Sequence, residues 1–137
     1  MRIVGLDVSD ARIGVAVADE LALFVHAVGV VRRVGGRRDF DAIDRLVGEP
    51  RPGLFVVGLP INMDDTEGPQ ARKVRAFGAR LATHSSLPVD FWDERLTTFA
   101  AADELRAAQV PQRRHKALLD QIAARLILEG YLAHHRT

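Results

Sequence analysis

Cysteine is absent from this chain, and net charge and aromatic residues are scarce. Because none of its 137 residues is cysteine, disulfides and thiolate chemistry are excluded. The formal net charge is only +1, so any basic footprint for nucleic acid must be local. Aromatic residues make up 6%, which leaves little for base stacking. No apolar run approaches the roughly 18 residues of a membrane-spanning helix, and we expect no membrane partner.

The remaining composition is that of an ordinary globular protein, with 47% hydrophobic and 27% charged residues. At this length we expect a single domain over residues 1–137, with one sizeable core. Met1 leads directly into an apolar strand pattern, without the basic region and apolar core of a signal peptide. We therefore expect a cytoplasmic protein.

The first twenty residues carry the feature around which the other predictions are arranged. An apolar run from Ile3 to Leu6 ends on Asp7, and apolar residues resume from Ile13 to Val17 after a short turn. This pattern predicts a β-hairpin with buried strands. A carboxylate in a buried strand is costly unless a cation, a metal or hydrogen-bond donors pair with it. Asp7 therefore needs a partner.

Downstream, β-branched runs alternate with amphipathic stretches of helical period. The patterns predict strands over residues 21–31, 53–59 and 88–92, and helices over 39–49, 69–83, 97–108 and 117–134. Asp39 is the expected N-cap of the first helix. The order β-β-β-α-β-α-β-α-α predicts an α/β fold. Its five-stranded mixed sheet has an antiparallel meander of three strands and two parallel strands, flanked by helices.

Carboxylates are expected to meet at one edge of that sheet. Asp7 ends the first strand, Asp93 and Glu94 end the fifth, and Asp120 shares a stripe with inward-facing residues of the last helix. Such oxygen ligands suit Mg²⁺ or Mn²⁺, and two ions could stabilise a phosphodiester displacement. Because Asp93 and Glu94 are adjacent on an extended chain, only one is expected to reach the metal, and spacing does not decide which.

Several polar and basic residues near these acids are candidates for contacts with a nucleic-acid backbone. Arg95 could equally pair with Asp93, and the arginine-rich segment 32–38 is either a solvated loop or a phosphate contact. No histidine shares ligand spacing with acids on one face, so no transition-metal site is predicted. The backbone-contact candidates are Arg12, Asn62, Thr66, Arg95, Arg113, Arg114 and Lys116.

Four stretches follow one another along the chain: GLDVSDARIGVAVAD, VVGLPINMDDTEGPQA, DERLTT and the helix around LLDQIAARLIL. Together they resemble the YqgF family, also called RuvX, whose members are nucleases of precursor 16S rRNA related to Holliday-junction resolvases. The resemblance implies an RNase H-like fold and metal-dependent hydrolysis of phosphodiester bonds. It also implies that the catalytic, metal-binding acids are Asp7, Glu94 and Asp120, which favours Glu94 over Asp93.

The chain departs from the family pattern at the basic pair of the first turn, where Ala11-Arg12 leaves one cation, and at two glycine positions. Ser9 stands where the family usually has Gly, and Asp65 replaces the Gly of the loop motif. Gly adopts positive φ angles that Ser does not, so we expect a differently shaped first turn. Asp tolerates the left-handed region better than most residues.

The resemblance favours a nuclease that matures the 5′ end of precursor 16S rRNA, with Mg²⁺ or Mn²⁺ as cofactor. One alternative is the same chemistry on branched DNA, as a Holliday-junction resolvase, which needs a symmetric dimer to cut two strands. Another is a non-catalytic nucleotide or nucleic-acid binding module, because a strand–Asp–turn–strand opening also begins the actin-like ATPases. The sequence leaves both a monomer and a homodimer open.

Overall fold

The computed structural model describes residues 1–19, 21, 24–95, 104, 107–109, 111 and 115–135. Within these residues the chain forms alternating strands and helices, in agreement with the predicted α/β class. The elements are β1 (Ile3–Val8), β2 (Arg12–Ala18), β3 (Val25–Arg32), α1 (Arg37–Val47), β4 (Leu54–Leu59), α2 (Pro69–Ser85), β5 (Val89–Asp93) and α4 (His115–His135).

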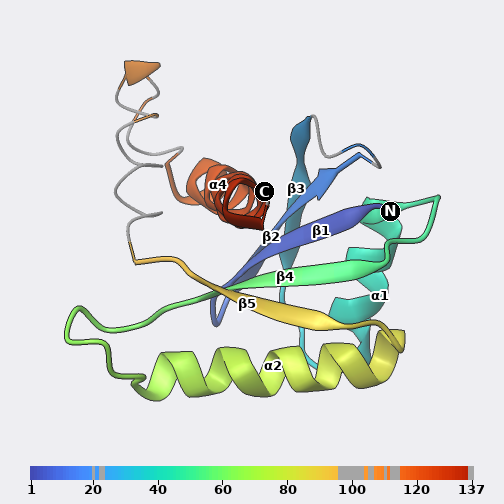
Figure 1. The fold of residues 1–137 in the computed structure, drawn as a ribbon, viewed down its shortest axis with the longest axis horizontal. Coiled ribbons are helices and arrows are strands. Elements are labelled where there is room, and N and C mark those ends of the chain that lie inside the picture. Colours follow the sequence, from blue (N-terminus) through green and yellow to red (C-terminus); the bar gives the residue numbers. More distant parts are fainter. Residues whose placement is uncertain are drawn as a thin grey trace.

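One five-stranded sheet, in the order β3-β2-β1-β4-β5, organises the fold (Figure 1). The β1–β2 and β2–β3 pairs are antiparallel, whereas β1, β4 and β5 run parallel. The predicted five-stranded mixed sheet is therefore confirmed. Because β1, β3, β4 and β5 all run in one direction, their carboxyl ends lie at one edge of the sheet together with the β1–β2 turn. We call this the carboxyl edge.

Helices cover both faces of the sheet, with α4 on one face and α1 and α2 on the other (Figure 1). Side chains alternate across each strand, so Val4 and Leu6 of β1 pack in the core beneath α1 and α2. Ile3 packs in the second core, beneath α4. By the same alternation Asp7 lies on the α4 face of the sheet.

Glycines in the strands allow α4 to lie directly on the sheet. A Cβ atom at Gly14 of β2 would overlap the backbone carbonyl oxygen of Asp120. A Cβ atom at Gly58 of β4 would meet Ile127 of α4 and would come within 2.5 Å of the Glu94 Oε2 atom. Because these positions have no side chain, the α4 backbone, and Asp120 with it, can pack against the end of the sheet where Asp7 lies.

The prediction that Asp39 caps α1 is wrong. The helix begins at Arg37, its N-cap is Gly36, and no side chain caps it. The Asp39 carboxylate is buried and accepts hydrogen bonds from the backbone N–H groups of Val34 and Gly35, at 2.9 and 3.1 Å. An Asp beside a turn can satisfy turn amides as well as helix amides, so the sequence pattern alone did not separate the two roles.

Other boundaries differ by a few residues or lie outside the described part of the chain. The third strand, predicted from Leu21, begins at Val25. The predicted helix over residues 97–108 falls mostly outside the described residues. No helix in the described ranges is both long enough and apolar enough to cross a membrane.

Candidate active site

Asp7 lies near the end of β1, at the carboxyl edge and beneath α4. Its partner across the β1–β2 ladder is Gly14, and the absent side chain there lets Asp120 approach. Burial and the nearby Asp120 carboxylate raise the pKa of Asp7 to about 7. Asp7 therefore lies among other acids, the setting in which the sequence analysis expects a cation, a metal or hydrogen-bond donors to pair with it.

Glu94 reaches Asp7 from the end of β5. Its backbone N–H donates to the Leu59 carbonyl oxygen at 3.2 Å, which fixes the residue just beyond the sheet ladder. Burial and the Asp7 charge raise the pKa of Glu94 to about 8. The Asp7 and Glu94 carboxyl groups lie within hydrogen-bonding reach of each other, and with pKa values raised to about 7 and about 8 the pair retains a proton near neutral pH. The adjacent Asp93 instead accepts hydrogen bonds from Arg95, so Glu94 is the member of the pair that contacts Asp7.

Asp120 comes to the same place from the beginning of α4. It is only 9% exposed, and its Oδ2 atom lies 2.5 Å from the Arg12 Nε atom. Arg12 begins β2 directly after a turn that Ser9 closes. The Ser9 hydroxyl donates to the Arg12 carbonyl at 3.0 Å and accepts from the Arg12 N–H at 3.1 Å. Ser9 does not adopt a positive φ, so this turn needs no glycine there.

Among the described side chains, these acids outnumber the cations beside them. Arg12 is the one described cation that pairs with the group, and the surplus negative charge is reduced by the proton that the Asp7–Glu94 pair retains. Carboxylate oxygens are the ligands that hard divalent cations prefer. The donor set is therefore compatible with a divalent metal ion, which would replace that proton.

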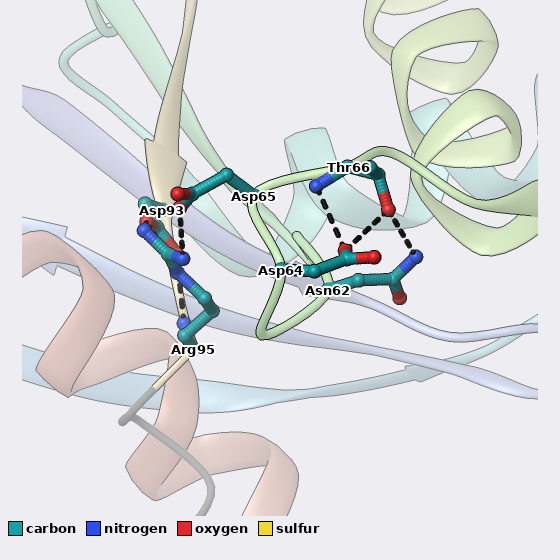
Figure 2. Close-up of polar contacts among 6 residues, drawn as sticks. All are labelled: Asn62, Asp64, Asp65, Thr66, Asp93 and Arg95. Carbon is teal, nitrogen blue, oxygen red and sulfur yellow. Dashed lines mark hydrogen bonds and ion pairs between the residues drawn. The ribbon is translucent and has the colours of Figure 1, made fainter.

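The loop between β4 and α2 directs its polar side chains toward one another (Figure 2). The Asn62 Nδ2 atom donates to Thr66 Oγ1 at 3.0 Å, and the Thr66 hydroxyl donates to Asp64 Oδ1 at 2.5 Å. Asp65 has a φ of 70°, so Asp adopts the left-handed conformation where the family resemblance expects Gly. The predicted contact residues Asn62 and Thr66 thus follow β4 at the carboxyl edge, with hydrogen bonds inside the loop.

Arg95 lies between two acids, Asp93 and Asp65 (Figure 2). Its Nη2 atom is 2.7 Å from Asp93 Oδ2, and its Nη1 atom pairs with Asp65. Although burial acts in the opposite direction, the hydrogen bonds from Arg95 lower the pKa of Asp93. Of the two interpretations that the sequence left open, the geometry favours the ion pair over a free phosphate contact.

The basic segment before Asp120 is described only in part. Arg113 and Arg114 lie outside the described residues, and the backbone of Lys116 lies in the first turn of α4. Their contact with a nucleic-acid backbone stays a prediction.

Reasoning from the sequence missed one group of side chains whose types could ligate a metal ion. His84 of α2 lies against two acids of α1, with its Nε2 atom 3.4 Å from Asp44 Oδ2 and 3.8 Å from Asp41 Oδ1. Asp41 and Asp44 are three residues apart on α1, a spacing that signals a shared helix face. Their histidine comes from another helix, which no local spacing reveals.

The ligand atoms of Asp41, Asp44 and His84 all lie within 4.8 Å of one another, and no other triad in the described ranges does so. Asp7, Glu94 and Asp120 therefore lie further apart than a formed ligand set, and Arg12 holds the Asp120 carboxylate. The contacts of His84 with Asp41 and Asp44 account for the α1–α2 group without a metal, and Asp44 is exposed to water, where such contacts are weak.

Comparison with solved structures identifies the class of fold. The T. thermophilus RuvC, in a structure with a Holliday junction substrate, matches with a TM-score of 0.57 at 22% sequence identity. The match covers 98% of this chain and 97% of that chain. At this identity the likeness concerns the fold alone. The mixed sheet with helices on both faces is the RNase H-like fold of RuvC-type proteins.

Sequence relatives define the family. The RuvX family, described as Holliday junction resolvase, matches residues 1–134. A protein of Symbiobacterium thermophilum is 47% identical over 132 residues, covering 96% of this chain and 92% of that relative. One of Clostridioides difficile (strain 630) is 42% identical over 131 residues, covering 96% and 93%. Both relatives are named pre-16S rRNA nuclease. The chain belongs to the RuvX family.

Proposed function

We propose that the chain is a metal-dependent nuclease that hydrolyses phosphodiester bonds of RNA, with the 5′ end of precursor 16S rRNA as its natural target. The observation that carries the proposal is the hydrogen-bonded pair of Asp7 and Glu94, with raised pKa values, beside Asp120 at the carboxyl edge. Membership of the RuvX family supports the nuclease chemistry, and the name of the relatives supports the rRNA target.

In this proposal Asp7, Glu94 and Asp120 hold Mg²⁺ or Mn²⁺, most simply as two ions. The ions would supply charge stabilisation for the attacking and the leaving oxygen of the phosphodiester. Asp7 is central, because it contacts Glu94 and lies within the electrostatic influence of Asp120. If Asp120 held a metal, Arg12 would lose its ion-pair partner. Its guanidinium would then be available to a substrate phosphate.

Branched DNA is the second candidate substrate. It is favoured by the family description, Holliday junction resolvase, and by the junction in the T. thermophilus RuvC structure. Symmetric cleavage of two strands would require a homodimer, whereas a monomer suffices for trimming one RNA strand. We place the RNA activity in one domain over residues 1–137 and in the cytoplasm, where precursor rRNA is processed.

A cleavage assay with Mn²⁺ tests the proposal. Wild type and Asp7→Asn would be given a labelled precursor rRNA 5′ fragment and, separately, a four-way DNA junction. We expect wild type to cut the RNA and spare the junction. Asp7→Asn should lose cleavage while retaining RNA binding, because it removes a metal ligand and keeps the shape of the side chain.

Asp44→Asn is the matched control, because it makes the same chemical change in the other group of ligating side chains. It should cleave at the wild-type rate. Loss of activity in Asp44→Asn with full activity in Asp7→Asn would move the metal site to α1 and α2. Symmetric junction cleavage with intact RNA would establish the resolvase instead.

A further inference from the structure

A cavity of about 460 Å³ lies between α1 and α2, on the face of the sheet that α4 does not cover. Three arginines line it: Arg33, which follows β3, Arg37 in the first turn of α1, and Arg80 on α2. Phe40 and Phe77 form its apolar floor. The cavity takes no part in the carboxylate cluster, and its lining holds three cations against one acid, Asp39, so its surplus charge suits an anionic ligand.

A second cavity, of about 470 Å³, extends this site toward the carboxyl edge. Arg33 and Arg80 line both cavities, so the two are neighbours on the surface, and the second one adds Lys73 of α2 and Asp10. Asp10 belongs to the β1–β2 turn, which directly follows the strand that carries Asp7. The two neighbouring cavities therefore extend from the α1–α2 side to the β1–β2 turn at the carboxyl edge, where the strand that carries Asp7 ends. We call Arg33, Arg37, Lys73 and Arg80 the basic path.

The charges of the basic path are largely available. Arg80 is exposed and makes no ion pair within the described part of the chain. Arg37 has one distant acid, Asp41 at 3.9 Å, and Lys73 has a solvent-exposed contact with Asp10 at 3.5 Å. Exposed pairs of this kind are weak, so an arriving phosphate can replace them. Arg33 differs, because the buried Asp39 lies 3.4 Å away and holds it in place.

The aromatic floor does not offer a surface for bases. Phe40 and Phe77 are 7% and 1% exposed. The Arg33 guanidinium lies 5.3 Å from the centroid of the Phe77 ring, and the His84 ring lies 5.2 Å from that of Phe40. Stacking of a base would require an open ring face. The site can therefore recognise phosphates but has no means of reading bases by stacking.

We propose that the basic path binds the phosphate backbone of the substrate strand outside the reacting bond. This inference rests on the proposed nuclease function and adds where the rest of the strand runs: over the β1–β2 turn and into the groove between α1 and α2. Its contacts are independent of sequence. They are made only by strands long enough to extend from the carboxylates across the turn.

The test compares Arg80→Glu with Arg45→Glu. Arg45 is also an exposed helical arginine without an ion pair among the described residues, and it lines neither cavity. Binding of a labelled RNA of about 16 nucleotides would be followed by anisotropy, in the Asp7→Asn background to prevent cleavage. We expect Arg80→Glu to weaken binding about tenfold and to reduce the salt slope by about 0.7, the value for one phosphate contact with a single strand. Arg45→Glu should bind like the parent.

Strand length provides the second measurement. An RNA of about four nucleotides cannot reach the groove, so Arg80→Glu with Asp7 intact should cleave it with a kcat/KM within about twofold of wild type. Equal losses in Arg80→Glu and Arg45→Glu, or an equal loss on both strand lengths, would overturn the inference and leave the nuclease proposal standing. A wild type that cleaves neither RNA would overturn both.

Competition by a free mononucleotide provides the last measurement. If AMP displaced the long RNA as effectively as an unlabelled strand does, the groove would be a mononucleotide site and the inference would be wrong. Melting curves of both variants establish that they are folded, which exposed side chains at positions 45 and 80 allow.

Discussion

Two clusters of charge lie where β5 ends, and they separate two residues that are adjacent in the sequence. Glu94 joins Asp7 and Asp120 beneath α4, where Arg12 is the one cation that pairs with these acids among the described side chains. Asp93 joins Asp65 around a cation of its own, Arg95 (Figure 2). We call them the α4 cluster and the Arg95 cluster.

Both clusters are built from carboxylates around an arginine, and they differ in burial and in charge balance. In the α4 cluster, burial raises the pKa of Asp7 and of Glu94. In the Arg95 cluster, hydrogen bonds from Arg95 outweigh burial and lower the pKa of Asp93. Acids that are buried without a compensating charge indicate a functional site, whereas neutralised acids near solvent indicate loop structure. The density of acids alone would not distinguish the two.

The largest expected effect separates the two neighbours directly. Glu94→Gln removes a proposed metal ligand, so kcat/KM for RNA should fall about a thousandfold, corresponding to about 4 kcal/mol of transition-state stabilisation. Asp93→Asn makes the same change one residue earlier and should stay within about threefold of wild type. A cleavage assay with Mn²⁺ measures both. If Asp93→Asn were inactive and Glu94→Gln active, Asp93 would be the metal ligand and Glu94 would not.

Gly14→Ala should have the next largest effect, on stability. The added Cβ would overlap the Asp120 carbonyl oxygen, so α4 has to move away from β2. We expect the free energy of unfolding to fall by about 3 kcal/mol, or the melting temperature by roughly 10 °C, because the α4 backbone cannot move aside as a flexible side chain can.

Gly68→Ala is the control for that experiment. Its new Cβ would approach only the Asn62 side chain, at 3.2 Å, and the cost should stay below about 1 kcal/mol. Urea unfolding of both variants gives the two free energies. Equal costs would show that the contact between α4 and β2 is not as close as the structure has it.

The pH dependence of the metal-free protein should be opposite to that of most paired acids. The pKa of Asp7, about 7, and that of Glu94, about 8, exceed those of free carboxyls, so the folded state holds protons that the unfolded chain has released. The free energy of unfolding should therefore fall as pH rises from about 4 to about 8. The slope is at most about 1.4 kcal/mol per pH unit for each proton.

Asp7→Asn isolates this contribution. In EDTA it should be more stable than wild type at pH 8, by about 1–3 kcal/mol, and should show little advantage at pH 4. Asp44→Asn should keep the wild-type slope. Mn²⁺ should stabilise wild type increasingly as pH rises, because a metal displaces the shared proton. A wild-type slope that persists unchanged in Asp7→Asn would show that Asp7 titrates like an ordinary surface acid.

The positions of Asp7, Glu94 and Asp120 along their elements were accessible from the sequence. Strand ends can be located from apolar runs, and the phase of a helix places Asp120 in line with Ile127. The order of elements predicted the fold class. Because the carboxyl ends of parallel strands meet at one edge, that order also predicted that these acids lie close together. The choice of Glu94 over Asp93 needed the family resemblance, since alternation along a strand separates the two but does not say which one faces α4.

Contacts between distant segments were not accessible in the same way. The Asp65–Arg95 pair depends on a loop conformation with a φ of 70°, and the His84 contacts depend on how α1 and α2 pack. Neither leaves a periodic trace in the sequence. Asp39 shows the same limit locally, because its carboxylate binds the amides of the preceding turn instead of those of its own helix.

The smallest expected effect is that of Arg95→Ala, and it tests the Arg95 cluster itself. Its partners Asp65 and Asp93 are exposed, and exposed ion pairs are weak, so the free energy of unfolding should fall by less than about 1 kcal/mol. The kcat/KM for RNA should stay within about threefold of wild type. Asp65→Asn is the matched variant, because Asn retains the left-handed backbone and removes the charge. If Arg95→Ala raised KM tenfold and reduced the salt dependence while Asp65→Asn did neither, Arg95 would be a phosphate contact that leaves its acids when RNA binds. Similar small effects in both variants would establish it as a support for the loop.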